Sequence, residues 1–202
     1  MEQRTHHYDV IVVGKGNAAL CAALSAREHG ARVALLEAAT QEESGGNSRF
    51  AGGVMRFAYA SVDDLKTVTD LTEEEIATSD YFTNTTDEFF DDLFRLTSYR
   101  TDPQLSEILV TRSLETMQWL RGKGVKFVPN YGRQSALVNG RRKFFGRMPI
   151  EVSGGGDSGS RPCARAWSNS GANAARSSSS RRNMSSIGSR TGFPCEMYSY
   201  TS

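Results

Sequence analysis

The sequence lacks the features of a membrane, disulfide-rich or metal-binding protein. Its longest apolar stretches are far too short to cross a bilayer, and Met1–His7 contains no apolar run of the kind found in secretory signals. Its three cysteines, Cys21, Cys163 and Cys195, are widely spaced and form no Cys-x-x-Cys pair. We therefore expect a cytoplasmic protein with no transmembrane segment, no disulfide framework and no metal site.

Apolar residues are also nearly absent from the end of the sequence. After Gly156, Ile187 is the only Ile, Leu or Val, and Ser, Arg, Gly, Ala and Asn dominate. Because this composition cannot bury a core, we expect a disordered tail over residues 157–202. Its Arg residues would suit RNA or another polyanion. No aromatic residues are interleaved with the run at Arg181 and Arg182, however, so we expect no nucleic-acid partner.

The first forty residues carry the pattern of a strand, a helix and a second strand. Asp9–Gly14 is a short β-branched run typical of a buried parallel strand. Asn17–His29 is rich in Ala at helical spacing, and Gly30 is placed to end the helix. Arg32–Glu37 is a second apolar strand. This βαβ unit predicts an α/β protein with a Rossmann-like domain, whose N-terminal part we assign to residues 1–60.

Residues 61–156 predict helices followed by a hairpin. Thr72 and Glu75 form a capping-box pattern, and Asp102 with Pro103 marks a second helix start. The predicted elements are a helix over 72–97, a helix over 102–122, a strand at 125–128 and a hairpin tip at 137–141. Five aromatic residues lie close together in this segment, namely Tyr81, Phe82, Phe89, Phe90 and Phe94. Their helical spacing predicts packing in the core rather than a ligand pocket.

A Gly-x-Gly-x-x-Ala turn, Gly14-Lys15-Gly16-Asn17-Ala18-Ala19, lies between the first predicted strand and the helix. Gly14 permits the tight turn, Gly16 lets the backbone approach a pyrophosphate, and Ala19 allows close packing of helix on strand. The free N–H groups at the helix start, including those of Asn17 and Ala18, then face the phosphates. Glu37 is placed to accept hydrogen bonds from ribose hydroxyls, which disfavours NADP. The alternative is a Gly-containing turn of an unrelated α/β protein.

A second glycine-rich segment distinguishes between the dinucleotides that this turn can bind. Ser44-Gly45-Gly46-Asn47-Ser48 and then Ala51-Gly52-Gly53 follow the second strand. The glycine pairs let backbone amides approach an extended ligand, while the Asn47 and Ser48 side chains offer hydrogen bonds to phosphate or polyol oxygens. We therefore predict FAD rather than NAD, with Gly45, Gly46, Gly52 and Gly53 also in its site. The alternative is an ordinary flexible loop.

Together these motifs resemble the succinate dehydrogenase/fumarate reductase flavoprotein family. The residues that carry the resemblance are Tyr8–Gly14, Gly16–Ala19, Glu37 and Gly45–Ser48. Four further segments look closest to the FAD-dependent tricarballylate dehydrogenase branch, namely Thr101–Pro103, Trp119–Leu120, Gly124–Phe127 and Gly154–Gly156. The resemblance covers residues 8–156.

The resemblance implies a non-covalent FAD, because the His that tethers the cofactor in some relatives is absent between Gly46 and Gly53. It implies that Gly52 and Gly53 lie near the flavin ring and that residues 61–156 lead toward a cap domain. The implied reaction is hydride transfer from a small carboxylic acid to flavin, as in the oxidation of tricarballylate to cis-aconitate. An electron-accepting membrane or iron–sulfur partner would fit the family.

The segment after Gly156 departs from the family, in which a cap domain and a returning C-terminal segment supply the substrate-binding Arg and His residues. Asp157–Ser160 stands where a Gly-Leu-rich helix is implied, and with suitable codons a reading frame one base earlier would encode one. We therefore interpret the tail as a frameshifted translation, expect a truncated and inactive chain, and assign no catalytic residue. The alternatives are another flavin desaturase, fumarate reductase-like or 3-ketosteroid dehydrogenase-like, and an inert fragment.

Overall fold

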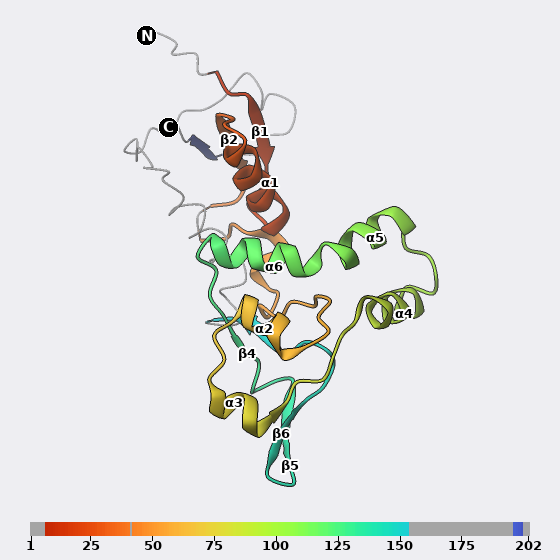
Figure 1. Ribbon diagram of the computed structural model, residues 1–202. Coiled ribbons are helices and arrows are strands. Elements are labelled where there is room, and N and C mark those ends of the chain that lie inside the picture. The colour runs from red at the N-terminus through yellow and green to blue at the C-terminus, as the bar shows by residue number, and fades with distance from the viewer. Residues whose placement is uncertain (1–6, 41, 154–195, 200–202) are drawn as a thin grey trace, which may run out of the picture. The chain divides into compact units, whose positions relative to one another are not determined.

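The computed structural model describes residues 7–40, 42–153 and 196–199, the last four by their backbone alone. The chain divides into two compact units. Of the described residues, 7–40, 42–51 and 196–199 belong to the N-terminal unit, and 52–153 belong to the helical unit (Figure 1). In the described part of the chain, no helix combines the length and the apolar character that crossing a bilayer requires.

The N-terminal unit contains the predicted βαβ arrangement. Strand β1 (Val10–Val13) pairs in parallel with β2 (Val33–Glu37), and helix α1 (Asn17–Glu28) connects them. The helix buries Leu20, Ala23 and Leu24, while β2 is buried along most of its length. A left-handed residue after the helix, Gly30 with φ +82°, ends it as the sequence predicts. The strand and helix boundaries therefore confirm the α/β prediction.

The predicted burial of β1 is only partly correct. Ile11 and Val13 are 61% and 79% exposed, and both lie on one face of the strand because side chains alternate along it. The described part of the N-terminal unit supplies no element that buries this face. A continuous apolar run led us to expect cover on both sides.

A short strand near the end of the chain joins the same sheet. The backbone of β8 (Glu196–Ser199) pairs antiparallel with β2, with Glu37 opposite Glu196, and the sheet order is β1-β2-β8. The prediction of no regular structure after Gly156 is therefore wrong for these four residues. The rest of the predicted disordered tail, 157–195 and 200–202, lies outside the described residues.

The helical unit contains five described helices and three pairs of strands. The helices are α2 (Val62–Val68), α3 (Glu73–Thr78), α4 (Thr86–Leu96), α5 (Pro103–Thr111) and α6 (Ser113–Gly122). The strands are β3 (Ser79–Asp80), β4 (Phe127–Pro129), β5 (Ser135–Val138), β6 (Arg141–Phe144) and β7 (Ile150–Val152). Strand β6 pairs with both β3 and β5, and β4 pairs with β7 (Figure 1). The predicted hairpin tip is confirmed, with Asn139 and Gly140 both left-handed between β5 and β6.

The prediction of a single helix over 72–97 is wrong, because α3 ends at Thr78 and α4 begins only at Thr86. The capping box at Thr72 and Glu75 is present, but Phe82 is left-handed with φ +55° and a second capping box begins at Thr85. Between them the fully buried Asn84 donates its side-chain N–H to the Phe57 carbonyl oxygen at 2.7 Å. These tertiary contacts outweigh the apolar spacing that suggested one helix.

The aromatic cluster is only partly in the core. Tyr81 and Phe89 are buried, as predicted, whereas Phe82 is 57% exposed. Phe90 and Phe94 are half-buried and stack on each other with ring centroids 5.8 Å apart. The left-handed backbone of Phe82 turns its ring away from the helix face on which the spacing had placed it.

The helix predicted over 102–122 is two helices, α5 and α6, interrupted at Arg112. Asp102 caps α5 as predicted, since its Oδ1 accepts from the Leu105 N–H at 2.9 Å. At the break, the Ser113 hydroxyl donates to the Val110 carbonyl at 2.7 Å and accepts from the Ala58 N–H at 2.8 Å. Serine hydroxyls that bond back to the preceding turn bend helices, which accounts for the interruption.

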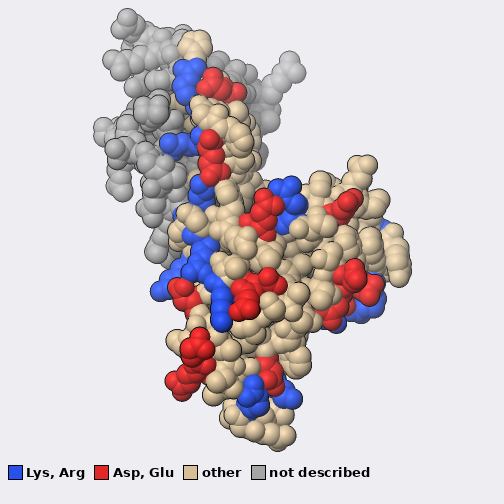
Figure 2. Space-filling view, in the orientation of Figure 1, with Lys and Arg blue, Asp and Glu red and all other residues tan. Residues whose placement is uncertain are grey.

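Charges of both signs are interspersed on the face of the helical unit seen in Figure 2. Several charged residues of the helical unit pair locally, such as Asp63 with Lys66 and Arg112 with Glu115.

Candidate cofactor site

The predicted phosphate turn lies between β1 and α1. Gly14 is left-handed with φ +103°, and its N–H donates to the Leu36 carbonyl at 2.7 Å, so the turn starts beside the end of β2. A Cβ on Gly14 would lie 3.9 Å from that of Ala19, which agrees with the close packing expected at this position. Gly16 is the N-cap of α1 and has no side chain to occupy the N–H groups of the first helical turn. These groups and the positive end of the helix dipole suit a phosphate.

The second glycine-rich segment is joined to this turn. Gly46–Arg49 forms a 3-10 turn (η1), and both Gly45 and Gly46 are left-handed. The Ser48 hydroxyl accepts a hydrogen bond from the Asn17 N–H at 3.0 Å. A Cβ on Gly16 would lie 3.5 Å from both the Gly45 carbonyl oxygen and Ser48 Oγ. The structure therefore brings together the two motifs that the sequence places thirty residues apart.

Glu37 is the last residue of β2, and the residue before it, Leu36, pairs with Val13 at the end of β1. Glu37 therefore lies at the edge of the sheet where the phosphate turn begins. The side chain is 9% exposed, and its Oε1 accepts a hydrogen bond from the Ala39 N–H at 3.0 Å. That bond fixes the carboxylate at the carboxyl end of the strand, where a ribose would lie in a dinucleotide fold.

The first turn of α1 contains a polar atom that suits a ligand. Asn17 Oδ1 is buried and has no hydrogen-bond partner among the described residues. A buried polar atom without a partner is costly, and a bound hydroxyl or ordered water would satisfy it. Ala18 follows Asn17 in this turn and is exposed, while Gly46 and Asn47 are exposed in the facing loop. The structure joins the phosphate turn to the facing loop through Asn17 and Ser48, and the assignment of the nine residues of the N-terminal unit to a dinucleotide site stays a prediction.

Gly52 and Gly53 belong to the helical unit and lie against β7. The Gly53 carbonyl accepts from the Val152 N–H at 2.8 Å, and Gly53 is left-handed with φ +78°. Arg133 Nη1 donates to the Gly52 carbonyl at 3.2 Å, and a Cβ on Gly52 would overlap this guanidinium. Sequence analysis missed Arg133, because nothing in its neighbourhood along the chain signals a contact with a residue eighty positions earlier.

The two glycines are expected to respond differently to substitution by alanine. Gly53→Ala should destabilise the protein by about 1 kcal/mol, because a left-handed conformation is costly for a residue with a Cβ. Gly52→Ala should cost only a few tenths, roughly the price of moving the mobile end of Arg133. Urea unfolding midpoints of both variants test this. Equal destabilisation would contradict the assignment of backbone strain to Gly53 alone.

In the described part of the chain, no group of three or more His, Cys, Asp and Glu side chains is placed to hold a metal ion. Cys21 is half-buried on α1 and is not in a disulfide bond. The polar groups described around the turn are backbone amides, the Ser48 hydroxyl and the Glu37 carboxylate.

Comparison with known proteins agrees with this geometry. A family model described as an FAD binding domain matches residues 9–176, which extends beyond Gly156, where the sequence resemblance was expected to end. The chain is 31% identical over 116 residues to a fumarate reductase (cytochrome) of Shewanella frigidimarina, covering 57% of this chain and 18% of that protein. It is 31% identical over 123 residues to a vinyl phenol reductase of Lactiplantibacillus plantarum, covering 59% and 21%. The chain thus spans about a fifth of the length of these curated relatives.

Solved structures show the same fold. A flavocytochrome c3 fumarate reductase in an open conformation matches 79% of this chain and 24% of its own, with a TM-score of 0.52 and 25% identity. A 3-ketosteroid-Δ4-(5α)-dehydrogenase from Rhodococcus jostii matches 81% of this chain and 36% of its own, with a TM-score of 0.54 and 18% identity. The second likeness, at this identity, concerns the fold alone.

Proposed function

Because the chain belongs to the family of FAD-binding domains found in succinate dehydrogenase/fumarate reductase flavoproteins, we propose that it is the cofactor-holding part of an FAD-dependent dehydrogenase. FAD is the cofactor of this family and of this chain. The observation that carries the proposal is the hydrogen bond from the Asn17 N–H to Ser48 Oγ, which unites the phosphate turn with the second glycine segment in a chain matched by the family model.

Each predicted residue has a proposed role toward the cofactor. The N–H groups after Gly14 and Gly16, including that of Ala18, would bind the pyrophosphate, and Glu37 would accept from the adenosine ribose. Gly45, Gly46, Asn47 and Ser48 would follow the ribityl chain. Gly52 and Gly53 would lie near the flavin ring, with Arg133 orienting their turn. We propose non-covalent binding, since no His lies between Gly46 and Gly53.

Bound FAD would supply hydride acceptance, and the protein would supply binding and orientation. For the substrate we propose a small carboxylic acid, specifically tricarballylate oxidised to cis-aconitate. This finer assignment is supported by the resemblance of Thr101–Pro103, Trp119–Leu120, Gly124–Phe127 and Gly154–Gly156 to the tricarballylate branch. For the final electron acceptor we propose a membrane or iron–sulfur partner on the same ground.

Two measurements test the proposal separately. The purified 202-residue chain should bind FAD, and ADP should compete for the site whereas FMN, which lacks the adenosine, should not. Absence of FAD binding, or competition by FMN alone, would refute the cofactor site. We further propose that the substrate groups are encoded in another frame after Gly156, so tricarballylate should bleach bound flavin anaerobically only in a frame-restored protein. Bleaching by a 3-ketosteroid and by no carboxylic acid would instead favour the steroid dehydrogenase alternative.

A further inference from the structure

The helical unit contains a cavity of about 330 Å³ that includes none of the residues assigned to FAD. Its walls are mostly aromatic or apolar, and they consist of Tyr59, Tyr81, Phe82, Thr83, Glu88, Phe144, Phe145, Gly146, Arg147, Met148 and Pro149. Cavities of this size that combine an apolar lining with a few polar groups are typical of small-molecule sites. Phe82 and Phe145 are 57% and 50% exposed, so both rings have surface on which a ligand can pack.

Two residues of the lining have a strained backbone. Phe82 and Arg147 both have φ +55°, a left-handed conformation that is rare for residues with long side chains. Such strain persists only where surrounding contacts impose it, and it concentrates at binding sites. Here it places one aromatic ring and one guanidinium on the same cavity.

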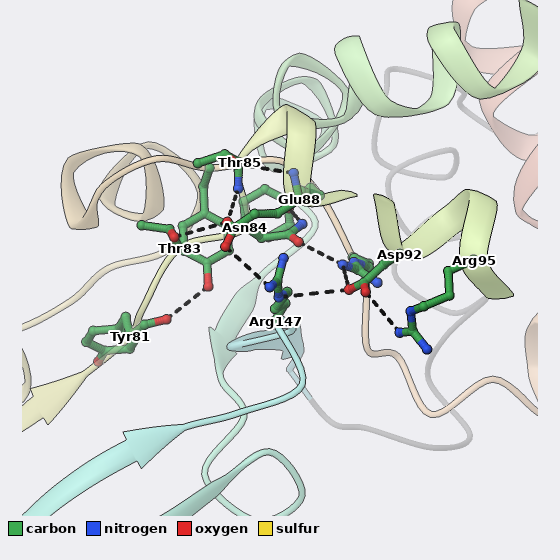
Figure 3. Close-up of polar contacts among 11 residues, drawn as sticks. Tyr81, Thr83, Asn84, Thr85, Glu88, Asp92, Arg95 and Arg147 are labelled. Carbon is green, nitrogen blue, oxygen red and sulfur yellow. Dashed lines mark hydrogen bonds and ion pairs between the residues drawn. The ribbon is translucent and has the colours of Figure 1, made fainter. Parts of the chain in front are cut away.

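Arg147 is the positively charged residue of the lining. Its ion pairs with Glu88 and Asp92 are longer than those that Asp92 forms with Arg56 and Arg95. Its Nη2 lies 3.3 Å from Glu88 Oε1 and its Nε lies 3.8 Å from Asp92 Oδ2. Figure 3 shows the three side chains in one cluster of polar contacts. Asp92 has closer partners, with Arg56 at 2.6 Å and Arg95 at 3.0 Å. The Arg147 guanidinium is therefore the group best placed to gain from a further anion.

Glu88 would not repel that anion strongly, because its charge is already compensated. Its Oε2 accepts from the Thr85 N–H at 2.8 Å and from the Thr83 hydroxyl at 3.1 Å, at the N-terminus of α4. The Thr85 N–H is the main cause that holds the pKa of Glu88 below its usual value. Of the two tyrosine hydroxyls of the lining, that of Tyr59 donates to the Tyr81 carbonyl at 2.9 Å, whereas that of Tyr81 is buried without a hydrogen-bond partner among the described residues.

We propose that this cavity binds a small aromatic carboxylate, with its ring among the aromatic side chains and its carboxylate paired with Arg147. The proposal is independent of the assigned FAD reaction. Tight binding requires both the ring and the carboxylate of the ligand, because the walls offer apolar contact and the guanidinium offers charge-assisted hydrogen bonds.

Ligand-observed NMR titration of the full chain with benzoate, acetate and benzyl alcohol tests it. Benzoate should bind at least about tenfold more tightly than either probe that lacks the ring or the charge. Arg147→Gln should weaken benzoate about tenfold, whereas Arg95→Gln should change it less than about twofold. Arg95 is the matched control, because it also pairs with Asp92 but is 69% exposed and does not line the cavity.

A second variant, Phe145→Ala, tests the proposal if Arg147→Gln fails to fold. Phe145→Ala should fold, because the backbone N–H of residue 145 still donates to the Gln134 carbonyl. It should weaken benzoate and leave acetate unchanged. Equal affinities for the three probes, no benzoate binding by a folded protein, or equal losses in the Arg147 and Arg95 variants would each overturn the proposal.

Discussion

Gly16→Val is expected to weaken FAD binding about a hundredfold, equivalent to roughly 2.7 kcal/mol. Gly16 adopts φ −74° and ψ 174°, an extended conformation open to any residue, so backbone strain is not the cause. A Cβ at this position would meet the Gly45 carbonyl and Ser48 Oγ only at ordinary contact distance, 3.5 Å. The added methyl groups of valine would instead fill the space that the pyrophosphate needs above the first turn of α1.

Variants of the facing loop separate this steric effect from the loss of single contacts. Asn47→Ala and Ser48→Ala remove one side chain each and leave the approach to the helix open. Both should lower FAD affinity less than Gly16→Val does, and Gly16→Ala should lie between them and valine. The measurement is the flavin content and FAD dissociation constant of each purified protein. Stoichiometric flavin in the valine variant would contradict the proposed pyrophosphate site.

The βαβ unit was predictable because its signals are local. A β-branched run, a Gly-rich turn and an Ala-rich helix each specify one element, and a short right-handed crossover then leaves few arrangements. The pairing of Val13 with Leu36, and the placement of Glu37 beside the turn, follow from that topology. The Asn17 to Ser48 bond follows less directly, since the path of the intervening loop is set by the left-handed Gly45 and Gly46.

The helical unit was predicted less well because long-range contacts override its periodicity. Leu105 and Leu109 recur four residues apart within the helix predicted over 102–122, a spacing that favours one buried face, yet they are 66% and 52% exposed. The buried positions of α5 include Ser106 and Val110 instead. Hydrophobic spacing identifies a helix but cannot identify which face meets the core when the partners are other short elements. The hydrogen bond from Arg56 to Asp92 of α4 also comes from outside the helix.

Asp92→Asn is expected to destabilise the protein by about 2 kcal/mol at neutral pH. Asp92 Oδ2 accepts from Arg56 Nη2 at 2.6 Å, and both side chains are largely buried, at 23% and 19% exposed. Arg56 also donates to Asn84 Oδ1 at 2.9 Å and lies 4.6 Å from the centre of the Phe89 ring. Replacing the carboxylate with an amide keeps the shape but leaves a guanidinium in a poorly hydrated position without its counter-charge.

The pH dependence gives this prediction its magnitude and its sign. The pKa of Asp92 is lowered from 3.8 to about 2. The hydrogen bond from Arg56 is the largest cause of this shift, and the hydrogen bond from Arg95 is the second largest. A depressed pKa means that the folded state binds the proton less readily than the unfolded state does. The resulting stability of about 2 kcal/mol is complete above pH 4 to 5 and is lost as the pH falls through about 2.

Urea unfolding of the wild type and of Asp92→Asn, compared between pH 7 and pH 2, therefore measures the charge interaction. The difference between the two proteins should be about 2 kcal/mol at pH 7 and should shrink toward zero as Asp92 becomes protonated. Other carboxylates titrate alike in both proteins and cancel. Asp63→Asn is the control, because Asp63 pairs with Lys66 at 3.3 Å but is 87% exposed, and such pairs contribute roughly 0 to 1 kcal/mol. A difference that persists unchanged at pH 2, or one no larger than that of the control, would show that the Arg56 pair does not stabilise the helical unit through charge.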